Sequence, residues 1–211
     1  MLDQRPKNIS FDTETAVDTL IQYSLSGSEK AFEEIVHRYE KQVYNAAFCM
    51  VKNREDAMDI AQEVFIKVLR GLSKFRGDCS FSTWIARITR NTAADFLRAS
   101  GRMQTVSLTD EDEDGNEQEL VLADTSTDSD PVRSYDRNQT VALVRDAIAA
   151  LPPPAREVII LREIHQLSYE DIAATLGIEE GTVKSRLNRA KKAMKEFLMA
   201  KNALDSSSSY I

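Results

Sequence analysis

The chain has 211 residues, of which 42% are hydrophobic, so it can bury one or two cores of ordinary size. Its formal net charge is −7, so any surface that binds nucleic acid must be local. No apolar run is long enough to span a bilayer, and no segment has the form of a signal peptide. Two cysteines without metal-binding spacing are interpreted as reduced thiols of a cytoplasmic protein, and two isolated histidines predict no metal site. Seven glycines and five prolines are few, which favours an all-α fold.

The first predicted block of helices covers residues 15–102. Apolar residues recur there at helical spacing in four segments, which predicts four helices. Asn53 is expected to cap the third helix, and Ser80 or Ser82 the fourth. Residues 71–78 are expected to form the loop between these two helices.

One face of the third helix is acidic, because Asp56, Asp59 and Glu63 follow one another at helical spacing. Such a cluster would suit a nuclease that uses two metal ions, or a di-iron site in a helical bundle. No Glu-x-x-His motif and no second acidic helix accompany it, so a face that is solvated or that binds another protein is preferred. No catalytic residue and no metal ligand is therefore expected.

The fourth helix carries a basic stripe, and aromatic residues lie in and beside the loop before it. Unpaired bases stack on aromatic rings and phosphates bind cations, so this combination suits single-stranded DNA. Aromatic residues at helical spacing are also common in ordinary cores, and that structural interpretation stays open. The residues concerned are Phe75, Phe81, Trp84, Arg87, Arg90, Asn91, Arg98 and Arg102.

A strongly acidic segment separates this block from the next. Between Met103 and Val132 there is no Lys or Arg, whereas Asp and Glu are frequent among Gly, Asn, Ser and Thr. This composition predicts a disordered linker whose charges repel one another. The predicted division is an N-terminal extension at 1–14, a first domain at 15–102, a flexible acidic linker at 103–134, a second domain at 135–200 and a polar tail at 201–211.

The second block contains the pattern of a helix-turn-helix. Ser168 followed by Asp171 is a start signal for the first helix of the motif. Gly177 lies where that helix must end and the chain must turn. Val183 and Leu187 then supply the buried stripe of the second helix. Together these signals predict a DNA-binding motif.

The second helix of this motif is strongly basic. From Thr182 to Lys201, seven Lys and Arg residues accompany a single Glu, which gives a local charge of +6. In such motifs the N-terminal part of the second helix enters the major groove, whereas cations further along meet phosphates. Arg186 is therefore expected to read a base and Lys192 to contact phosphate. A solvated basic face on an ordinary helical hairpin is the alternative.

Three segments of the chain together resemble the extracytoplasmic-function (ECF) sigma factors of bacterial RNA polymerase. The segments read GSEKAFEEIVHRYEKQVYNAAF, REDAMDIAQEVFIKVLRGLSKFRGDCSFSTWIARITRNTAADFLR and LPPPAREVIILREIHQLSYEDIAATLGIEEGTVKSRLNRAKKAM, and they cover more than half of the chain. The resemblance implies two small helical domains joined by the flexible acidic linker. Sigma domain 2 would be a four-helix bundle that recognises the −10 element, and sigma domain 4 would recognise the −35 element. The protein would initiate transcription at promoters and would not be an enzyme.

The resemblance also implies a partner for each surface. The acidic helix would bind the β′ clamp helices of core RNA polymerase through Asp56, Asp59, Gln62, Glu63 and Phe65. The −10 element would be melted and read by Phe75, Arg76, Ser80, Trp84, Arg87, Arg90 and Asn91. The −35 element would be read by Thr182, Lys184, Ser185, Arg186, Arg189 and Lys192. The β flap of the polymerase and an anti-sigma factor are further expected partners, and no cofactor is expected.

Two other classes of protein share part of this pattern. The helix-turn-helix alone also resembles the output domain of response regulators, but the upstream sequence lacks the strand–helix alternation of a receiver domain. A helical nuclease built on the acidic helix would cleave single-stranded DNA with magnesium and would lose that activity in the Asp59→Ala variant.

Overall fold

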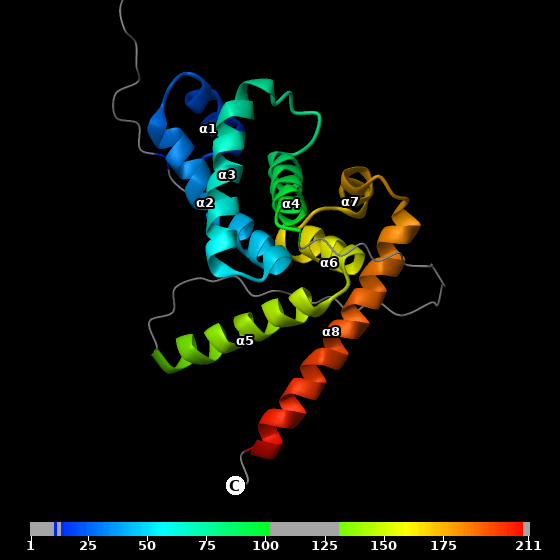
Figure 1. The fold of residues 1–211 in the computed structure, drawn as a ribbon. Helices are drawn as coiled ribbons and strands as arrows, with labels where there is room; N and C mark the ends of the chain where they lie inside the picture. The colour runs from blue at the N-terminus through cyan, green and yellow to red at the C-terminus, as the bar shows by residue number, and fades with distance from the viewer. Residues whose placement is uncertain (1–10, 12–13, 102–130, 209–211) are drawn as a thin grey trace, which may run out of the picture.

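The structure is a computed structural model that describes residue 11 and residues 14–101 and 131–208, with side chains left undescribed at 131–139 and 202–208. Every regular element in these ranges is a helix, which confirms the all-α prediction (Figure 1). The elements are α1 (Val17–Leu25), α2 (Glu29–Val51), α3 (Arg54–Gly71), η1 (Leu72–Lys74), α4 (Phe81–Ala99), α5 (Pro131–Ala150), α6 (Pro153–Ile159), η2 (Ile160–Ile164), α7 (Tyr169–Leu176) and α8 (Glu180–Ser208).

Helices α1 to α4 form the first block, and side-chain caps fix where the helices begin. The Asn53 side chain accepts a hydrogen bond from the Asp56 amide at 3.0 Å, which satisfies an amide that the first turn of α3 leaves unpaired. The Ser80 hydroxyl accepts one from the Thr83 amide at 3.0 Å and caps α4 in the same way. The structure thus confirms Asn53 and selects Ser80 over Ser82.

The core of this block comes from the inward stripes of α1 to α4. These stripes repeat every three or four residues, as expected for helices that bury one face. The largest fully buried side chains in it are Leu20, Ile35, Val43, Ile60, Val64, Val68, Leu72 and Ile85.

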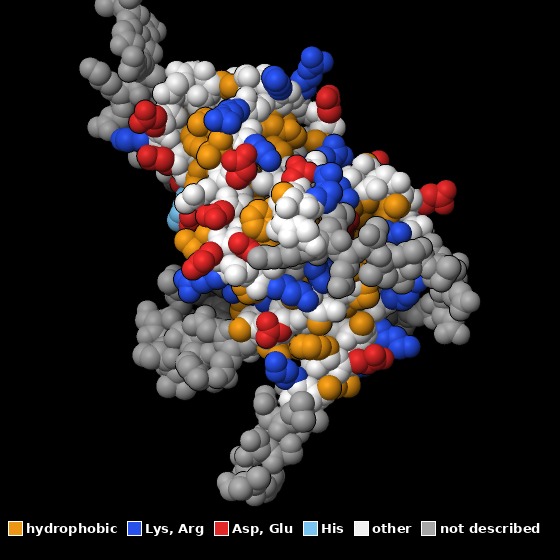
Figure 2. Space-filling view, in the orientation of Figure 1, with side chains coloured by type: hydrophobic (Ala, Val, Ile, Leu, Met, Phe, Trp, Pro, Cys, Tyr) orange, Lys and Arg blue, Asp and Glu red, His pale blue; other side chains and the backbone are white. Residues whose placement is uncertain are grey.

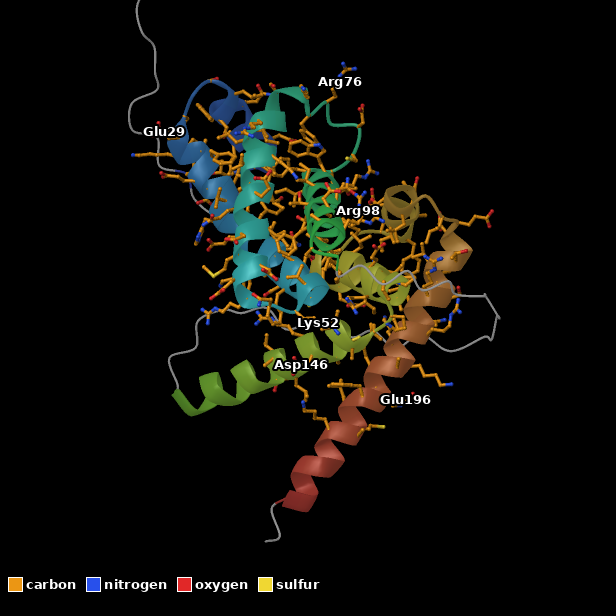
Figure 3. All side chains as sticks on the ribbon, in the orientation of Figure 1. Glu29, Lys52, Arg76, Arg98, Asp146 and Glu196 are labelled. Atoms are coloured by element: carbon orange, nitrogen blue, oxygen red, sulfur yellow. The ribbon has the colours of Figure 1, made fainter. Side chains whose placement is uncertain are left out.

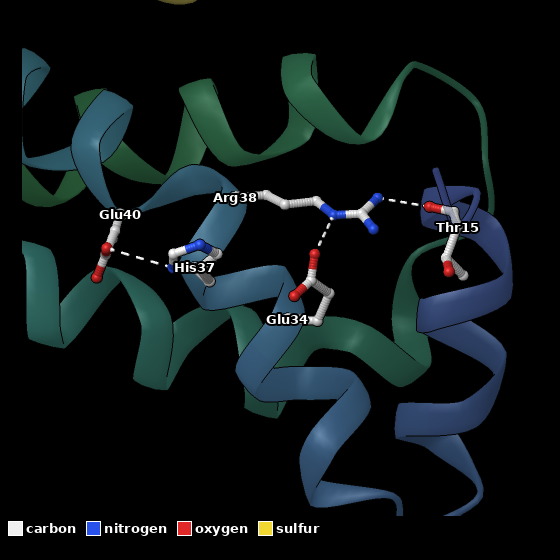
Figure 4. A network of polar contacts seen from close by, with 5 residues as sticks. All are labelled: Thr15, Glu34, His37, Arg38 and Glu40. Atoms are coloured by element: carbon white, nitrogen blue, oxygen red, sulfur yellow. Dashed lines mark hydrogen bonds and ion pairs between the residues drawn. The ribbon is translucent and has the colours of Figure 1, made fainter. Parts of the chain in front are cut away.

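A polar network on α2 ties the start of α1 to this bundle (Figure 4). Arg38 donates a hydrogen bond from Nε to Glu34 Oε1 at 2.7 Å and one from Nη1 to the Thr15 carbonyl at 2.5 Å. Nearby, His37 Nδ1 lies 3.8 Å from Glu40 Oε1, and both side chains are exposed. The Arg38 guanidinium therefore links the residue just before the N-terminal end of α1 to α2.

The loop expected at residues 71–78 is shorter than predicted. Gly71 still belongs to α3, and Leu72 to Lys74 form the single 3₁₀ turn η1. Leu72 is 2% exposed, and burying it keeps the chain helical for this extra turn. A Cβ on Gly71 would lie 3.1 Å from the Trp84 ring, so glycine permits this close contact.

Helices α5 to α8 form the second block, and the helix-turn-helix lies in α7 and α8. The Ser168 hydroxyl accepts a hydrogen bond from the Asp171 amide at 3.0 Å, and Gly177 ends α7 with a φ of +67°. Both features confirm the sequence prediction. The buried stripe of α8 consists of Val183, Leu187, Ala190 and Met194.

The ends of the second block differ from the expected boundaries. Helix α5 begins at Pro131, inside the segment expected to be linker, and α8 continues to Ser208, through most of the expected polar tail. No Gly or Pro interrupts α8 after its first turn, so nothing in the sequence ends it earlier. Residues 102–130 lie outside the described residues. None of the helices in the described part of the chain combines the length and apolar character needed to span a bilayer.

The two blocks pack against each other. Helix α2 contacts α5, α6 and η2, and α4 contacts α7. Gln42 on α2 donates a hydrogen bond to the Ile164 carbonyl at 2.7 Å, and Arg145 on α5 donates one to Asn45 at 2.5 Å. No local pattern in the sequence indicates this arrangement.

His165 ends η2 and is 2% exposed. Burial lowers the pKa of this imidazole from its ordinary 6.5 to about 4, because a charged ring would lose its hydration.

The folded state therefore favours the neutral ring of His165, and the free energy of unfolding should fall as the pH drops from about 6.5 towards 4. Urea unfolding at pH 5 should show a loss of about 2 kcal/mol relative to pH 7 from this residue. His165→Phe should remove that part of the pH dependence, whereas His37→Gln should keep it; an equal loss in His165→Phe would contradict the assignment.

Candidate functional site

The outer face of α3 combines carboxylates with exposed apolar side chains. Asp59, Gln62 and Glu63 are exposed, as expected of a face that is solvated or that binds another protein. Figure 2 shows the molecule from the side on which α3 faces the viewer, and acidic, basic and hydrophobic side chains are interspersed there. Three apolar residues on α3 that the sequence analysis missed are among the most exposed large hydrophobic side chains, namely Met58 (49%), Ile66 (42%) and Leu69 (54%).

Two other residues predicted for this surface are less exposed. Asp56 and Phe65 are half-buried, and Phe65 packs against the core. Glu63 lies 3.7 Å from Lys67 Nζ, an exposed ion pair within α3. Among the described residues, no group of three or more His, Cys, Asp or Glu side chains could hold a metal ion. An acidic face bordered by exposed apolar side chains is typical of a protein-binding surface.

The loop before α4 is anchored by an aromatic cluster. The ring centroid of Phe75 lies 5.1 Å from that of Trp84 and 5.5 Å from that of Phe81. Phe81 also contacts Tyr39 of α2 at 5.4 Å. Phe81 is buried, whereas Phe75 and Trp84 are half-buried. The core interpretation of these aromatics therefore holds for Phe81, while Phe75 and Trp84 keep part of their rings at the surface.

The polar candidates near α4 fall into two groups. Arg76 projects from the loop away from the helical body (Figure 3), and Asn91 is exposed on α4. Ser80 is exposed, but its hydroxyl already caps α4. Arg87 and Arg90 instead hydrogen-bond to the second block. Only part of the predicted DNA-binding set is therefore accessible when the two blocks are packed together.

Helical spacing sorts the candidates on α8 by direction. Ser185 and Lys192 lie opposite the buried stripe. Arg189 follows Ser185 by four residues and precedes Lys192 by three, so it lies next to both. These three therefore share the outer face. Arg186 lies three residues after Val183 and four before Ala190, which places it beside the buried stripe. Arg189 is thus better directed than Arg186 to enter a groove.

Further residues belong to this surface that the sequence analysis did not single out. Asn188 lies three residues after Ser185 on the outer face, and only the spacing could have indicated it. Tyr169, at the start of α7, lies between two cations: Arg162 is 5.0 Å and Lys184 Nζ 5.9 Å from the ring centroid. These contacts draw positive charge towards the junction of α7 and α8.

Comparison with family models identifies both blocks. Residues 35–103 match the model described as Sigma-70 region 2, and residues 142–194 match the one described as Sigma-70, region 4. The chain is therefore a sigma factor of RNA polymerase. It is 38% identical over 180 residues to the RNA polymerase sigma-H factor of Pseudomonas aeruginosa, which covers 85% of this chain and 92% of that protein. It is 39% identical over 176 residues to the ECF RNA polymerase sigma-E factor of Escherichia coli, covering 83% of this chain and 90% of that protein. The chain belongs to the ECF sigma factors.

Solved structures show the same fold. The structure of CnrH in complex with the cytosolic domain of CnrY matches with a TM-score of 0.59 and 24% identity, over 88% of this chain and 99% of that one. The sigma factor RpoE in complex with the anti-sigma factor NepR from Bartonella quintana matches with a TM-score of 0.57 and 22% identity, over 81% and 98%. As an ECF sigma factor, this chain binds core RNA polymerase and directs promoter recognition and transcription initiation.

Proposed function

We propose that the outer face of α3 is the contact with the β′ clamp helices of core polymerase. Asp59, Gln62 and Glu63 would supply the polar part of this contact, and Met58 and Leu69 the apolar part. Exposed apolar side chains support the proposal, because burying them against a partner is favourable. The half-buried Phe65 would support the helix from the side of the core.

The loop before α4 and the exposed side of α4 would hold the unpaired −10 strand. Phe75 and Trp84 offer partly exposed rings for stacking, and Arg76 offers a cation in the loop. Ser80 would act mainly through the position of the loop, because it caps α4. Arg87 and Arg90 would join this surface once they are released from the second block.

Helix α8 would read the −35 element in the major groove. The observation that carries this proposal is the outer face of α8, where Ser185, Arg189 and Lys192 lie opposite the buried stripe. Ser185 lies in the second turn of α8 and Arg189 in the third, where side chains can contact base edges, whereas Lys192 lies one turn further along and would meet phosphate. Thr182, Lys184 and Arg186 would flank this contact.

Run-off transcription tests the proposed function as a whole. Purified chain would be added to core polymerase on a library of genomic fragments, and transcript starts would be sequenced. Starts preceded by two short conserved elements are expected, and none should appear with core alone. Random starts in both reactions would overturn the proposal.

Asn91 offers a prediction specific to strand opening. The Asn91→Ala variant should recruit polymerase to duplex promoters normally but open them at least severalfold less, because the exposed amide can bond an unpaired base. Permanganate reactivity of promoter thymines would report the opening, and Asp95→Asn on the same helix serves as a control. Normal opening in Asn91→Ala would count against this role.

The chain would comprise two sigma domains and a linker. Domain 2 would cover residues 15–102 and domain 4 residues 135–200, joined by a linker at 103–134. The protein would act in the cytoplasm by binding rather than by catalysis, and an anti-sigma factor would be a regulatory partner. One of the similar solved structures is a sigma factor in complex with an anti-sigma factor, which supports this part.

A further inference from the structure

The methionines in the described part of the chain differ sharply in exposure. Met50 and Met194 belong to the hydrophobic core and are 8% and 2% exposed. Met58 on α3 and Met199 on α8 are 49% and 59% exposed. An oxidant can convert the thioether of methionine to a sulfoxide only where it can reach the sulfur. Met58 and Met199 are therefore the accessible thioethers among these four.

Met58 lies on the apolar edge of the outer face of α3. Leu69 follows it by eleven residues, which is about three helical turns, so the two side chains lie along one line. Gln62 is exposed one turn after Met58, and the exposed Asp59 directly follows it. Met58 thus belongs to the face that we propose for core polymerase. Met199, near the end of α8, lies outside every binding surface proposed above.

An oxygen atom on the Met58 sulfur would change the character of this edge. In the reaction with hydrogen peroxide the sulfur lone pair takes one peroxide oxygen, the O–O bond breaks, and the other oxygen leaves as water with both protons. The sulfur is oxidised by two electrons and the peroxide is reduced. The side chain keeps its length but gains a polar oxygen, and burying that oxygen in an apolar contact without a hydrogen-bond donor is unfavourable.

We propose that Met58 is a reversible oxidation site at which a peroxide switches off binding to core polymerase. Oxidation would leave the fold intact, because Met58 is exposed and outside the core. It would act on the free chain, since the bound polymerase would cover the sulfur. A thiol-dependent methionine sulfoxide reductase would restore the thioether, releasing the oxygen as water while two thiols become a disulfide. The inference rests on the clamp contact proposed for α3, and its test separates the two.

The experiment oxidises the purified full chain and then measures its binding to untreated core polymerase. Hydrogen peroxide is removed with catalase, and dithiothreitol reduces reversible products at Cys49 and Cys79. The affinity for core should fall about five- to fiftyfold, because the apolar edge has become polar. Reductases for both sulfoxide epimers should restore it, and circular dichroism checks that the oxidised chain stays folded.

Two leucine variants assign the effect to one sulfur. Leucine has nearly the volume of methionine but no oxidisable atom. The readout is the ratio of affinities after and before oxidation, so a change in the starting affinity of Met58→Leu does not enter. Met58→Leu should keep its affinity through the treatment, whereas Met199→Leu, which removes a similarly exposed thioether, should lose affinity like the parent. An equal loss in Met58→Leu and the parent would overturn the proposal.

A polar side chain of similar size should imitate the sulfoxide without any oxidant. Met58→Gln should bind core polymerase severalfold more weakly than Met58→Leu, because it places an amide on the apolar edge. Met199→Gln is the matched control and should bind like the parent chain. Equal binding of Met58→Gln and Met58→Leu would count against the proposal, since a polar group at this position would then be tolerated.

Protection by core polymerase separates this inference from the clamp contact itself. In the preformed complex, peroxide should oxidise Met58 at least severalfold more slowly than in the free chain, as mass spectrometry of the peptide that contains it would measure. Equal rates would overturn the clamp contact and the inference with it. Protection of Met58 together with unchanged affinity of the oxidised chain would support the clamp contact and overturn the oxidation switch alone.

Discussion

Replacing Asp59 by Arg should abolish co-purification with core polymerase and transcription from every promoter, while the fold stays intact. Asp59 is exposed on the outer face of α3 and has no hydrogen-bond or ion-pair partner among the described residues. Its replacement therefore costs the folded chain little. In a complementary interface, by contrast, a reversed charge costs about 2–5 kcal/mol or more, which lowers affinity by at least an order of magnitude.

The measurement is co-purification with tagged core polymerase, with circular dichroism as the check on folding. Glu33→Arg is the matched control, because it makes the same charge change at an exposed position on α2. Leu69→Ser should weaken core binding without a change of charge, since it removes an exposed apolar side chain from the same face. If Asp59→Arg co-purifies at the level of the unmodified chain, the clamp contact lies elsewhere.

The sequence predicts the helices of this fold well because the signals are local. The Asn53 and Ser168 caps and the left-handed Gly177 each depend on a few neighbouring residues, and all three appear as expected. The extra turn at Leu72 was missed because only burial against distant helices makes it favourable.

The candidate surfaces were predicted less completely than the helices. Met58 and Leu69 lie off the buried stripe of α3, so helical spacing could have indicated that they are exposed, although their apolar character alone suggests the core. The engagement of Arg90 by Glu157 joins residues far apart in the chain, and no local pattern indicates it. Charge and spacing located the surfaces, and tertiary packing decides which of their groups are accessible.

The direction of Arg189 on α8 leads to the second large effect. Arg189→Ala should weaken promoter binding by about 1–3 kcal/mol and relax the preference at one −35 base pair, because an arginine in the major groove bonds a guanine through two nitrogens. Its Nη2 lies 3.4 Å from the Ser185 hydroxyl, so the side chain follows the outer face of the helix. Arg186→Ala should have a smaller effect on base preference, since Arg186 lies beside the buried stripe.

Lys192→Ala completes the comparison by removing a charge without removing base recognition. Lys192 is exposed further along α8, where phosphate is the expected contact, so the variant should weaken all promoters alike and reduce the salt dependence of binding by about one counterion. Binding of polymerase holoenzyme to promoters that differ at single −35 positions, measured at several salt concentrations, distinguishes the two behaviours. A uniform loss in Arg189→Ala together with a base-specific loss in Arg186→Ala would show that the helix enters the groove by its flank, and the outer-face assignment would then be wrong.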